Sequence, residues 1–134
     1  MRFRVSTQGH NDMIDITDQV AEALAKSEVR DGAVLVFVNG STAALTTIEY
    51  EPGLKKDMNW LLEKIAPEDF DYEHHKTWGD HNGAAHLKSS LIGTDLTAPV
   101  EEGRLTLGTW QQIVLLDFDE KPREREIIVK IISD

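Results

Sequence analysis

The sequence contains no cysteine, and this absence removes several kinds of chemistry at once. Disulfides, thiolate zinc sites and thiol nucleophiles are all excluded. No apolar run approaches the roughly 20 residues that a membrane-spanning helix needs, and the stretch from Met1 to Val5 lacks the apolar core of a signal peptide. We therefore expect no membrane partner, and the lack of cysteine is compatible with the cytoplasmic localisation that we expect.

Positive charge is also scarce. The chain has 14 Lys and Arg residues against 24 Asp and Glu residues, which gives a net charge of −10 and a pI of about 4.9. Nucleic acid is an unfavourable partner for such a chain, because binding to phosphates needs a surplus of Lys and Arg. A small anionic ligand remains possible, since a local pocket can oppose the global charge.

The apolar patterning predicts one α+β domain over residues 1–134. Alternating or continuous apolar runs indicate strands over Arg2–Gln8, Ala33–Val38, Ala43–Tyr50, Leu96–Val100, Arg104–Thr109, Ile113–Phe118 and Glu124–Ile132. Helical spacing indicates a helix from a cap at Thr17 or Asp18 to about Ser27, and a second over Leu54–Ile65. This order favours a mostly antiparallel sheet or sandwich with two packed helices.

Finer features of this pattern concern turns and helix faces. In the second helix, the side chains expected to face inward are Leu54, Met58, Leu61, Leu62 and Ile65. Residues 101–103 (Glu-Glu-Gly) predict a hairpin turn. Residues 74–86 show no clear period, and Leu87–Ile92 is ambiguous between helix and strand.

Four of the five histidines lie within residues 74–86, together with Asp80. A set of His74, Asp80 and His86 with one open position would suit zinc or a similar divalent ion and would lower the pKa of a bound water. His75 is adjacent to His74 and cannot face the same way in an extended segment, and the choice between it, Asp80 and His81 stays open. Glycines also interrupt the window, so a histidine pair on one helix is not expected. The alternative is a solvated polar loop.

Two short motifs could bind a ligand. Ser41 and Thr42 follow an Asn-Gly pair between two strands and could present hydroxyls and N–H groups to an anion, although a plain β-turn explains them as well. Trp110 could stack on a planar ring, and Gln111 could hydrogen-bond it. The alternative for Trp110 is an anchor in the core or in an interface.

Two cationic residues could bind phosphate or carboxylate. The fork of donors on Arg104 suits such groups, but a salt bridge with Glu101 or Glu102 would account for it equally. Lys88 lies two residues after His86 and could neutralise an anion, or it could be a solvated surface charge.

Several blocks together resemble the YjbQ-like family, which is also labelled secondary thiamine-phosphate synthase. The blocks are AHLKSSLIG (residues 85–93), GRLTLGTWQ (103–111), STAALT (41–46) with Glu49, and YEH (72–74), followed by an Arg-rich closing strand from Arg123. The resemblance spans nearly the whole chain in the right order. It implies a small α+β domain that assembles as a homotrimer.

The resemblance also implies a weak thiamine-phosphate synthase activity, in which a pyrimidine diphosphate joins a thiazole phosphate and pyrophosphate leaves. It selects His74, Asp80 and His86 as the polar cluster and implies a metal or an anion near the histidines, the metal being a divalent ion such as zinc, magnesium or manganese. Lys88, Arg104, Trp110 and Gln111 are implied neighbours. Many members carry a histidine where this chain has Gly40, and Ile48 replaces a frequent asparagine.

Three hypotheses follow from these residues. The first is a transferase or hydrolase, assisted by metal or histidine, that acts on a small phosphorylated heterocycle. The second is a trimeric protein that binds a small anion, metabolite or metal without turnover. The third is a structural trimer stabilised by metal.

Overall fold

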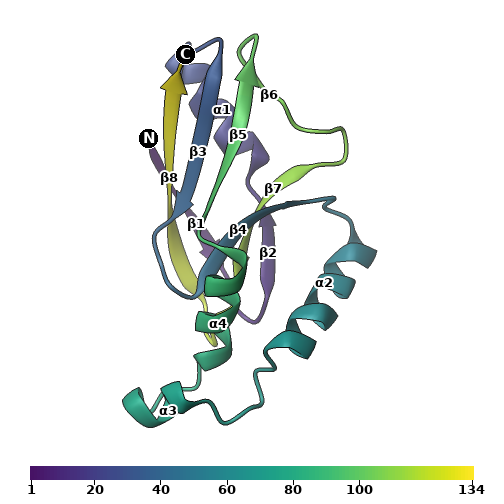
Figure 1. The fold of residues 1–134 in the computed structure, drawn as a ribbon, viewed down its shortest axis with the longest axis vertical. Coiled ribbons are helices and arrows are strands. Elements are labelled where there is room, and N and C mark those ends of the chain that lie inside the picture. Colours follow the sequence, from purple (N-terminus) through teal and green to yellow (C-terminus); the bar gives the residue numbers. More distant parts are fainter.

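The strands form two antiparallel sheets that share one core (Figure 1). The computed structural model describes all of residues 1–134. The larger sheet has the strand order β1-β8-β3-β5-β6, and the smaller has the order β2-β7-β4. The strands are β1 Arg2–Thr7, β2 Asp12–Asp15, β3 Gly32–Val38, β4 Ala43–Ile48, β5 Asp95–Glu101, β6 Arg104–Leu105, β7 Gln112–Asp117 and β8 Arg123–Ser133. The helices are α1 Thr17–Ser27, α2 Pro52–Ile65, α3 Glu73–Trp78 and α4 Gly83–Ile92.

The main core lies between the two sheets and is closed by α1. Side chains at every second position of β3 and β8, such as Val34, Val36 and Val129, meet Leu45 and Leu115 from the smaller sheet. This alternation is the two-residue period of a strand with one buried face. The expectation of an α+β domain with an antiparallel sandwich is confirmed.

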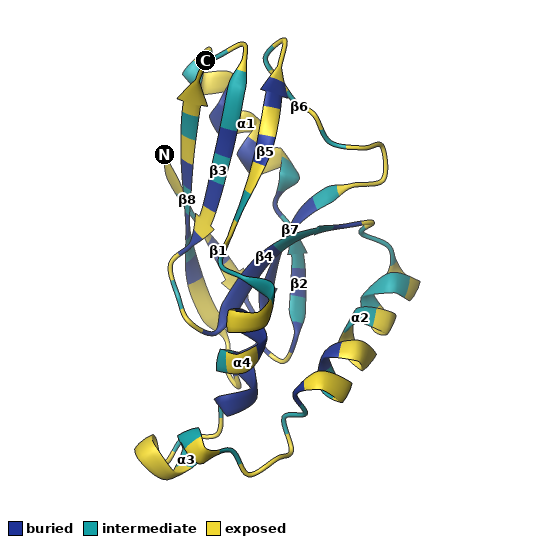
Figure 2. Cartoon of the chain, viewed as in Figure 1, coloured by how far each residue is buried: buried dark blue, intermediate teal, exposed yellow.

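A second, smaller core covers the other face of the small sheet. Val114 and Leu116 of β7 point to this face, where Leu62 of α2 and Ala85 of α4 pack against them. Strand β7 is therefore buried on both faces, which explains its continuous apolar run. Helix α2 packs on this core with one side only, and Figure 2 shows that its outward side is exposed along most of its length.

Most predicted strands and both predicted helices are present, with some corrections. The chain has four helices and not two, because the histidine-rich segment forms α3 and the Leu87–Ile92 stretch belongs to α4. Strand β2 is not among the predicted elements. Strand β6 has only two residues, so the expected strand over Arg104–Thr109 is mostly loop. The predicted hairpin turn is confirmed, since Glu101 pairs with Arg104 across it.

Two details of the predicted helices are also wrong. Leu61 and Ile65 of α2 do not face inward, because 45% and 53% of their surfaces are exposed. Neither proposed cap residue caps α1. The carboxylate of Asp15 accepts hydrogen bonds from the backbone N–H and the hydroxyl of Thr17 instead. None of the four helices combines the length and hydropathy that a membrane crossing requires.

Candidate functional site

The histidine window folds as two short helices joined by a tight turn. Helix α3 carries His74 and His75 and ends at Gly79, whose φ of 72° is left-handed and favours glycine there. Asp80 and His81 lie in the connection, and α4 carries His86 after Asn82. The interruption expected from the glycines is therefore present, with helical residues on both sides of it.

His74, Asp80 and His86 lie together. The rings of His74 and His86 have centroids 4.5 Å apart. Nε2 of His74 lies 3.2 Å from Oδ1 of Asn82 and 3.4 Å from Oδ1 of Asp80. Because both neighbours of Nε2 are acceptors, the ring hydrogen belongs on Nε2, which leaves Nδ1 of His74 as the free acceptor.

Asp80 contributes an unusual atom to this cluster. Its Oδ1 is buried and is the one buried side-chain oxygen or nitrogen without a hydrogen-bond partner. The Asp80 side chain as a whole is 41% exposed, and Nε2 of His74 lies 3.4 Å from this oxygen. A small shift of the His74 ring, or a bound cation or proton donor, would satisfy it.

His75 and His81 make different contacts from those of that cluster. Nε2 of His75 accepts a hydrogen bond from the backbone N–H of Gly83 at 3.1 Å, and its ring packs edge-on against Tyr72 and His81. A side chain at Gly83 would collide with Tyr72, since a Cβ there would lie 2.7 Å from that residue's Cβ. His75 thus holds α3 against α4 through its ring.

Burial sets the charge of His86. Its pKa is lowered from the usual value, first by desolvation and then by repulsion from His74, while Asp119, Asp80 and the carbonyl of Ser41 oppose the shift. The imidazole of His86 is therefore neutral near physiological pH, which is the form that accepts a proton or binds a metal.

The donor types of the cluster fit a divalent ion. Two imidazoles and a carboxylate are the ligand set of many zinc sites, and a carboxylate next to one ring N–H raises the basicity of the opposite nitrogen. The side chains are not arranged as such a centre here, because no group of three or more His, Asp or Glu residues converges on a common point.

Ser41 and Thr42 differ in their surroundings. Ser41 is exposed and lines a small pocket beside His86. Thr42 is buried, donates its hydroxyl hydrogen to Asp119 at 3.0 Å, and accepts a hydrogen bond from Nη2 of Arg125 at 2.6 Å. Thr42 is therefore part of a polar network below the pocket floor.

The sequence analysis did not predict this buried network. Asp117 is completely buried and accepts two hydrogen bonds from the guanidinium of Arg125, at 2.7 and 2.9 Å. Asp119 binds Arg123 at 3.0 Å, and several causes, among them the hydrogen bonds from Glu120 N–H and Thr42, lower the pKa of Asp119 despite its burial. The charges of this network reach His86 through Asp119.

Lys88 is fully buried and already paired. Its ammonium donates to Oε1 of Glu63 at 2.6 Å and to Oδ1 of Asn11 at 3.0 Å. These contacts link α4 to α2 and to the turn before β2. In this chain Lys88 faces the protein interior and not an open pocket.

The other predicted binding residues lie far from the histidines within one chain. Arg104 is exposed at the β5–β6 hairpin and has the expected alternative partner, Glu102, at 3.6 Å. Trp110 is 72% exposed, and Gln111 donates to Thr47 at 3.0 Å. Figure 1 places β6 and the following loop at the opposite end of the molecule from α3.

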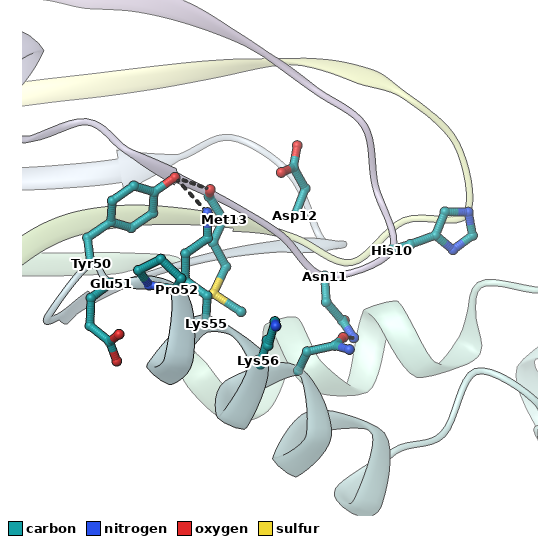
Figure 3. Close-up of a pocket in the computed structure, with 10 residues that line it drawn as sticks. His10, Asn11, Asp12, Met13, Tyr50, Glu51, Pro52, Lys55 and Lys56 are labelled. Atoms are coloured by element: carbon teal, nitrogen blue, oxygen red, sulfur yellow. Dashed lines mark hydrogen bonds between the residues drawn. The ribbon is translucent and has the colours of Figure 1, made fainter.

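A separate cleft of about 660 Å³ lies between β2 and α2 (Figure 3). The hydroxyl of Tyr50 donates to the carbonyl of Met13 at 2.9 Å and accepts from Lys55 at 3.1 Å. Lys56 lines the cleft as well. None of the residues selected from the sequence lines this cleft.

The comparisons with known proteins agree on one family. The family described as "UPF0047 protein YjbQ-like" matches residues 1–134. A UPF0047 protein of Archaeoglobus fulgidus is 43% identical over 132 residues, which cover 98% of this chain and 100% of the relative. The UPF0047 protein YugU of Bacillus subtilis is 36% identical over 132 residues, which cover 98% of this chain and 97% of YugU.

Solved structures show the same fold. A YbjQ-like protein of unknown function from Sulfolobus solfataricus superposes with a TM-score of 0.93 at 36% identity, covering 100% of this chain and 96% of that one. A hypothetical protein from Aeropyrum pernix gives a TM-score of 0.93 at 31% identity, covering 100% of this chain and 98% of that one. The chain belongs to the YjbQ-like (UPF0047) family.

Proposed function

We propose that the protein is an enzyme that acts on a small phosphorylated heterocycle, with His74, Asp80 and His86 as its catalytic residues. The observation that carries this proposal is the buried, unpartnered oxygen of Asp80 beside the paired imidazoles. Titratable groups gathered around an unsatisfied polar atom are candidates for a functional site.

The reaction that we propose is of the thiamine-phosphate synthase type. A thiazole nitrogen attacks the methylene carbon of the pyrimidine diphosphate, the bond from that carbon to the ester oxygen breaks, and pyrophosphate leaves with the electron pair. The protein must stabilise the charge that develops on the leaving group. The neutral imidazole of His86 can accept a proton at this site, and the Nε2 hydrogen of His74 is directed to Asn82 by a hydrogen bond.

We also propose that His74, Asp80 and His86 hold a divalent ion, which is zinc, magnesium or manganese. When bound, such an ion would supply Lewis-acid stabilisation to phosphate oxygens. The donor types and the unsatisfied oxygen of Asp80 support this assignment, and binding would require the three side chains to turn toward a common point.

The test has two arms. Elemental analysis of protein purified without a histidine tag measures bound metal in the wild type, in His86→Ala and in the control His10→Ala, which removes an exposed histidine paired with Glu68 at 3.1 Å. The release of pyrophosphate, when each sample is given the pyrimidine diphosphate and the thiazole phosphate, is then measured. We expect metal and turnover in the wild type and in His10→Ala, and neither in His86→Ala.

The other outcomes separate the alternatives. Turnover without metal would remove the ion from the proposal and leave the histidines as acid–base groups. Binding of metal or anion without turnover of any phosphorylated heterocycle would contradict the enzyme and favour the non-catalytic binding protein. Equal behaviour of His86→Ala and wild type would remove the histidine site altogether.

We further propose that the protein is a homotrimer. Large apolar side chains lie exposed on α2, α3, α4 and the loop before β7: Trp60, Leu61, Ile65, Trp78, Leu87, Leu91 and Trp110. Exposed patches of this kind indicate protein contacts. Assembly would also let a neighbouring copy bring Arg104 and Trp110 to the histidines. Sedimentation equilibrium should give three times the 15.1 kDa chain mass, and a monomer at micromolar concentration would refute the proposal.

A further inference from the structure

A small pocket lies where the loop after β3 meets the side of α4. Its volume is about 310 Å³, and it is lined by Gly40 and Ser41 from the loop and by His86, Ser90 and Thr94 from α4 and the residues just after it. His86 thus borders both this pocket and the histidine cluster. No carboxylate lines the pocket, which is unusual on a chain with a net charge of −10.

Arg125 lies behind Gly40, although it is not itself one of the residues that line the pocket. The residue is only 7% exposed, and its Nε and Nη2 are fixed by Asp117 and Thr42 at 2.6–2.9 Å. Nη1 takes part in none of these hydrogen bonds. It lies 2.8 Å from the position that a Cβ on Gly40 would occupy. Glycine at position 40 therefore lets a rigidly held guanidinium approach the loop closely.

The hydroxyls of the pocket are available as donors. Ser41, Ser90 and Thr94 form no side-chain hydrogen bond within the chain, whereas the neighbouring Ser89 donates its hydroxyl hydrogen to the carbonyl of Ala43 at 2.6 Å. A free guanidinium N–H and several free hydroxyls without a facing carboxylate suit an oxyanion better than a cation.

We propose that this pocket binds the phosphate oxygens of the substrate, with the hydroxyls of Ser41, Ser90 and Thr94 as donors and with Nη1 of Arg125, behind Gly40, turning toward the bound anion. The proposal rests on the proposed function, since it assigns the diphosphate of the substrate to the pocket beside His86. Arg125 and Gly40 are then residues that determine specificity for phosphorylated ligands.

The probe for this site is inorganic pyrophosphate, titrated calorimetrically into the full chain at fixed pH and low, constant salt. Gly40→Ala places a methyl against Nη1 and should weaken binding at least tenfold, because a hydrogen bond to a charged group is lost. Ser90→Ala removes an exposed hydroxyl without a structural partner and should weaken binding several-fold with no change in melting temperature. The matched control is Arg4→Gln, which removes one exposed positive charge, only loosely paired with Glu124 at 3.4 Å.

We expect pyrophosphate to bind Arg4→Gln as it binds the wild type. Equal affinities for wild type, Gly40→Ala and Ser90→Ala, or no binding to the wild type at millimolar pyrophosphate, would overturn the proposal. Failure of the proposed function looks different. Binding that depends on Gly40 and Ser90 without any turnover keeps this pocket and removes the reaction. If turnover needs His86 but neither variant changes the affinity for pyrophosphate, the reaction stands and the phosphate pocket is refuted.

Discussion

Replacing Lys88 by methionine should lower the stability of the protein by about 2–4 kcal/mol, although it changes no surface charge. The Lys88 side chain is 0% exposed, and its ammonium lies 2.6 Å from Glu63 and 3.0 Å from Asn11. Methionine has a similar length and volume, so little cavity forms. The loss comes from the carboxylate and the amide oxygen, which both lose their donor.

The magnitude follows from the burial of the two partners. Removal of one member of a buried ion pair costs about 3–5 kcal/mol. The side chain of Glu63 is 35% exposed, so water replaces part of the interaction and the expected loss is reduced to about 2–4 kcal/mol. For a domain of this size the fall in melting temperature is then roughly 6–16 °C.

The assay is thermal and urea unfolding at one fixed protein concentration, because assembly would make the midpoint depend on concentration. The control is Lys26→Met on α1, whose pair with Glu22 is exposed on both sides and should change stability by less than about 0.5 kcal/mol. Adding Glu63→Gln to Lys88→Met should restore part of the loss. The reasoning is refuted if Lys88→Met unfolds like the wild type.

Three further outcomes follow from other contacts. Gly83→Ala should destabilise the protein by about 1–3 kcal/mol, since its methyl would lie 2.7 Å from a side-chain carbon of Tyr72. The methyl of Gly79→Ala meets no atom within 4 Å, so this variant should lose only about 1 kcal/mol, from its positive φ. The urea midpoints of the two variants test this difference. Asp117→Ala should cost about 3–5 kcal/mol by removing the carboxylate that accepts two of the three hydrogen bonds of the buried Arg125 guanidinium, measured in the same way. In a proton NMR titration, the pKa of His10 should lie above the usual histidine value because Glu68 accepts its hydrogen bond, and the pKa of His86 below it because of burial; the reverse order would contradict the arrangement. The contribution of His10 to stability is then complete below the unfolded pKa and is lost as pH rises through the folded one.

The pattern of apolar residues predicted the sandwich because most of its strands are long enough to show whether one face or both faces are buried. Strand β8 alternates, and β7 is continuously apolar, so both carry the signal of a strand. Strand β2 escaped because it has four residues, Asp12–Asp15, with an acidic residue at each end. A run that short has no measurable period.

Helix α4 escaped for a different reason. Its buried positions are Gly83, Ala84, Ala85, Lys88 and Ser89, which include two polar residues, while Leu87 and Leu91 are exposed. The helix therefore shows its apolar side chains to the outside and its small and polar ones to the core, the opposite of the pattern that sequence analysis searches for.

For the buried pair of Asp117 and Arg125, the sequence predicts that each side chain is buried but not that the two meet. Along β8, Arg125 shares its side of the strand with Ile127 and Val129, both buried, so strand parity alone turns this arginine inward. Asp117 ends a strand that is apolar on both faces, and a carboxylate there needs a partner. Parity and burial thus require two inward charges of opposite sign, but only the connection from β7 in the smaller sheet to β8 in the larger sheet determines that they meet. Nη1 of Arg125 is then left over because Asp117 binds only the other two nitrogens, a result of side-chain geometry that no spacing in the sequence encodes.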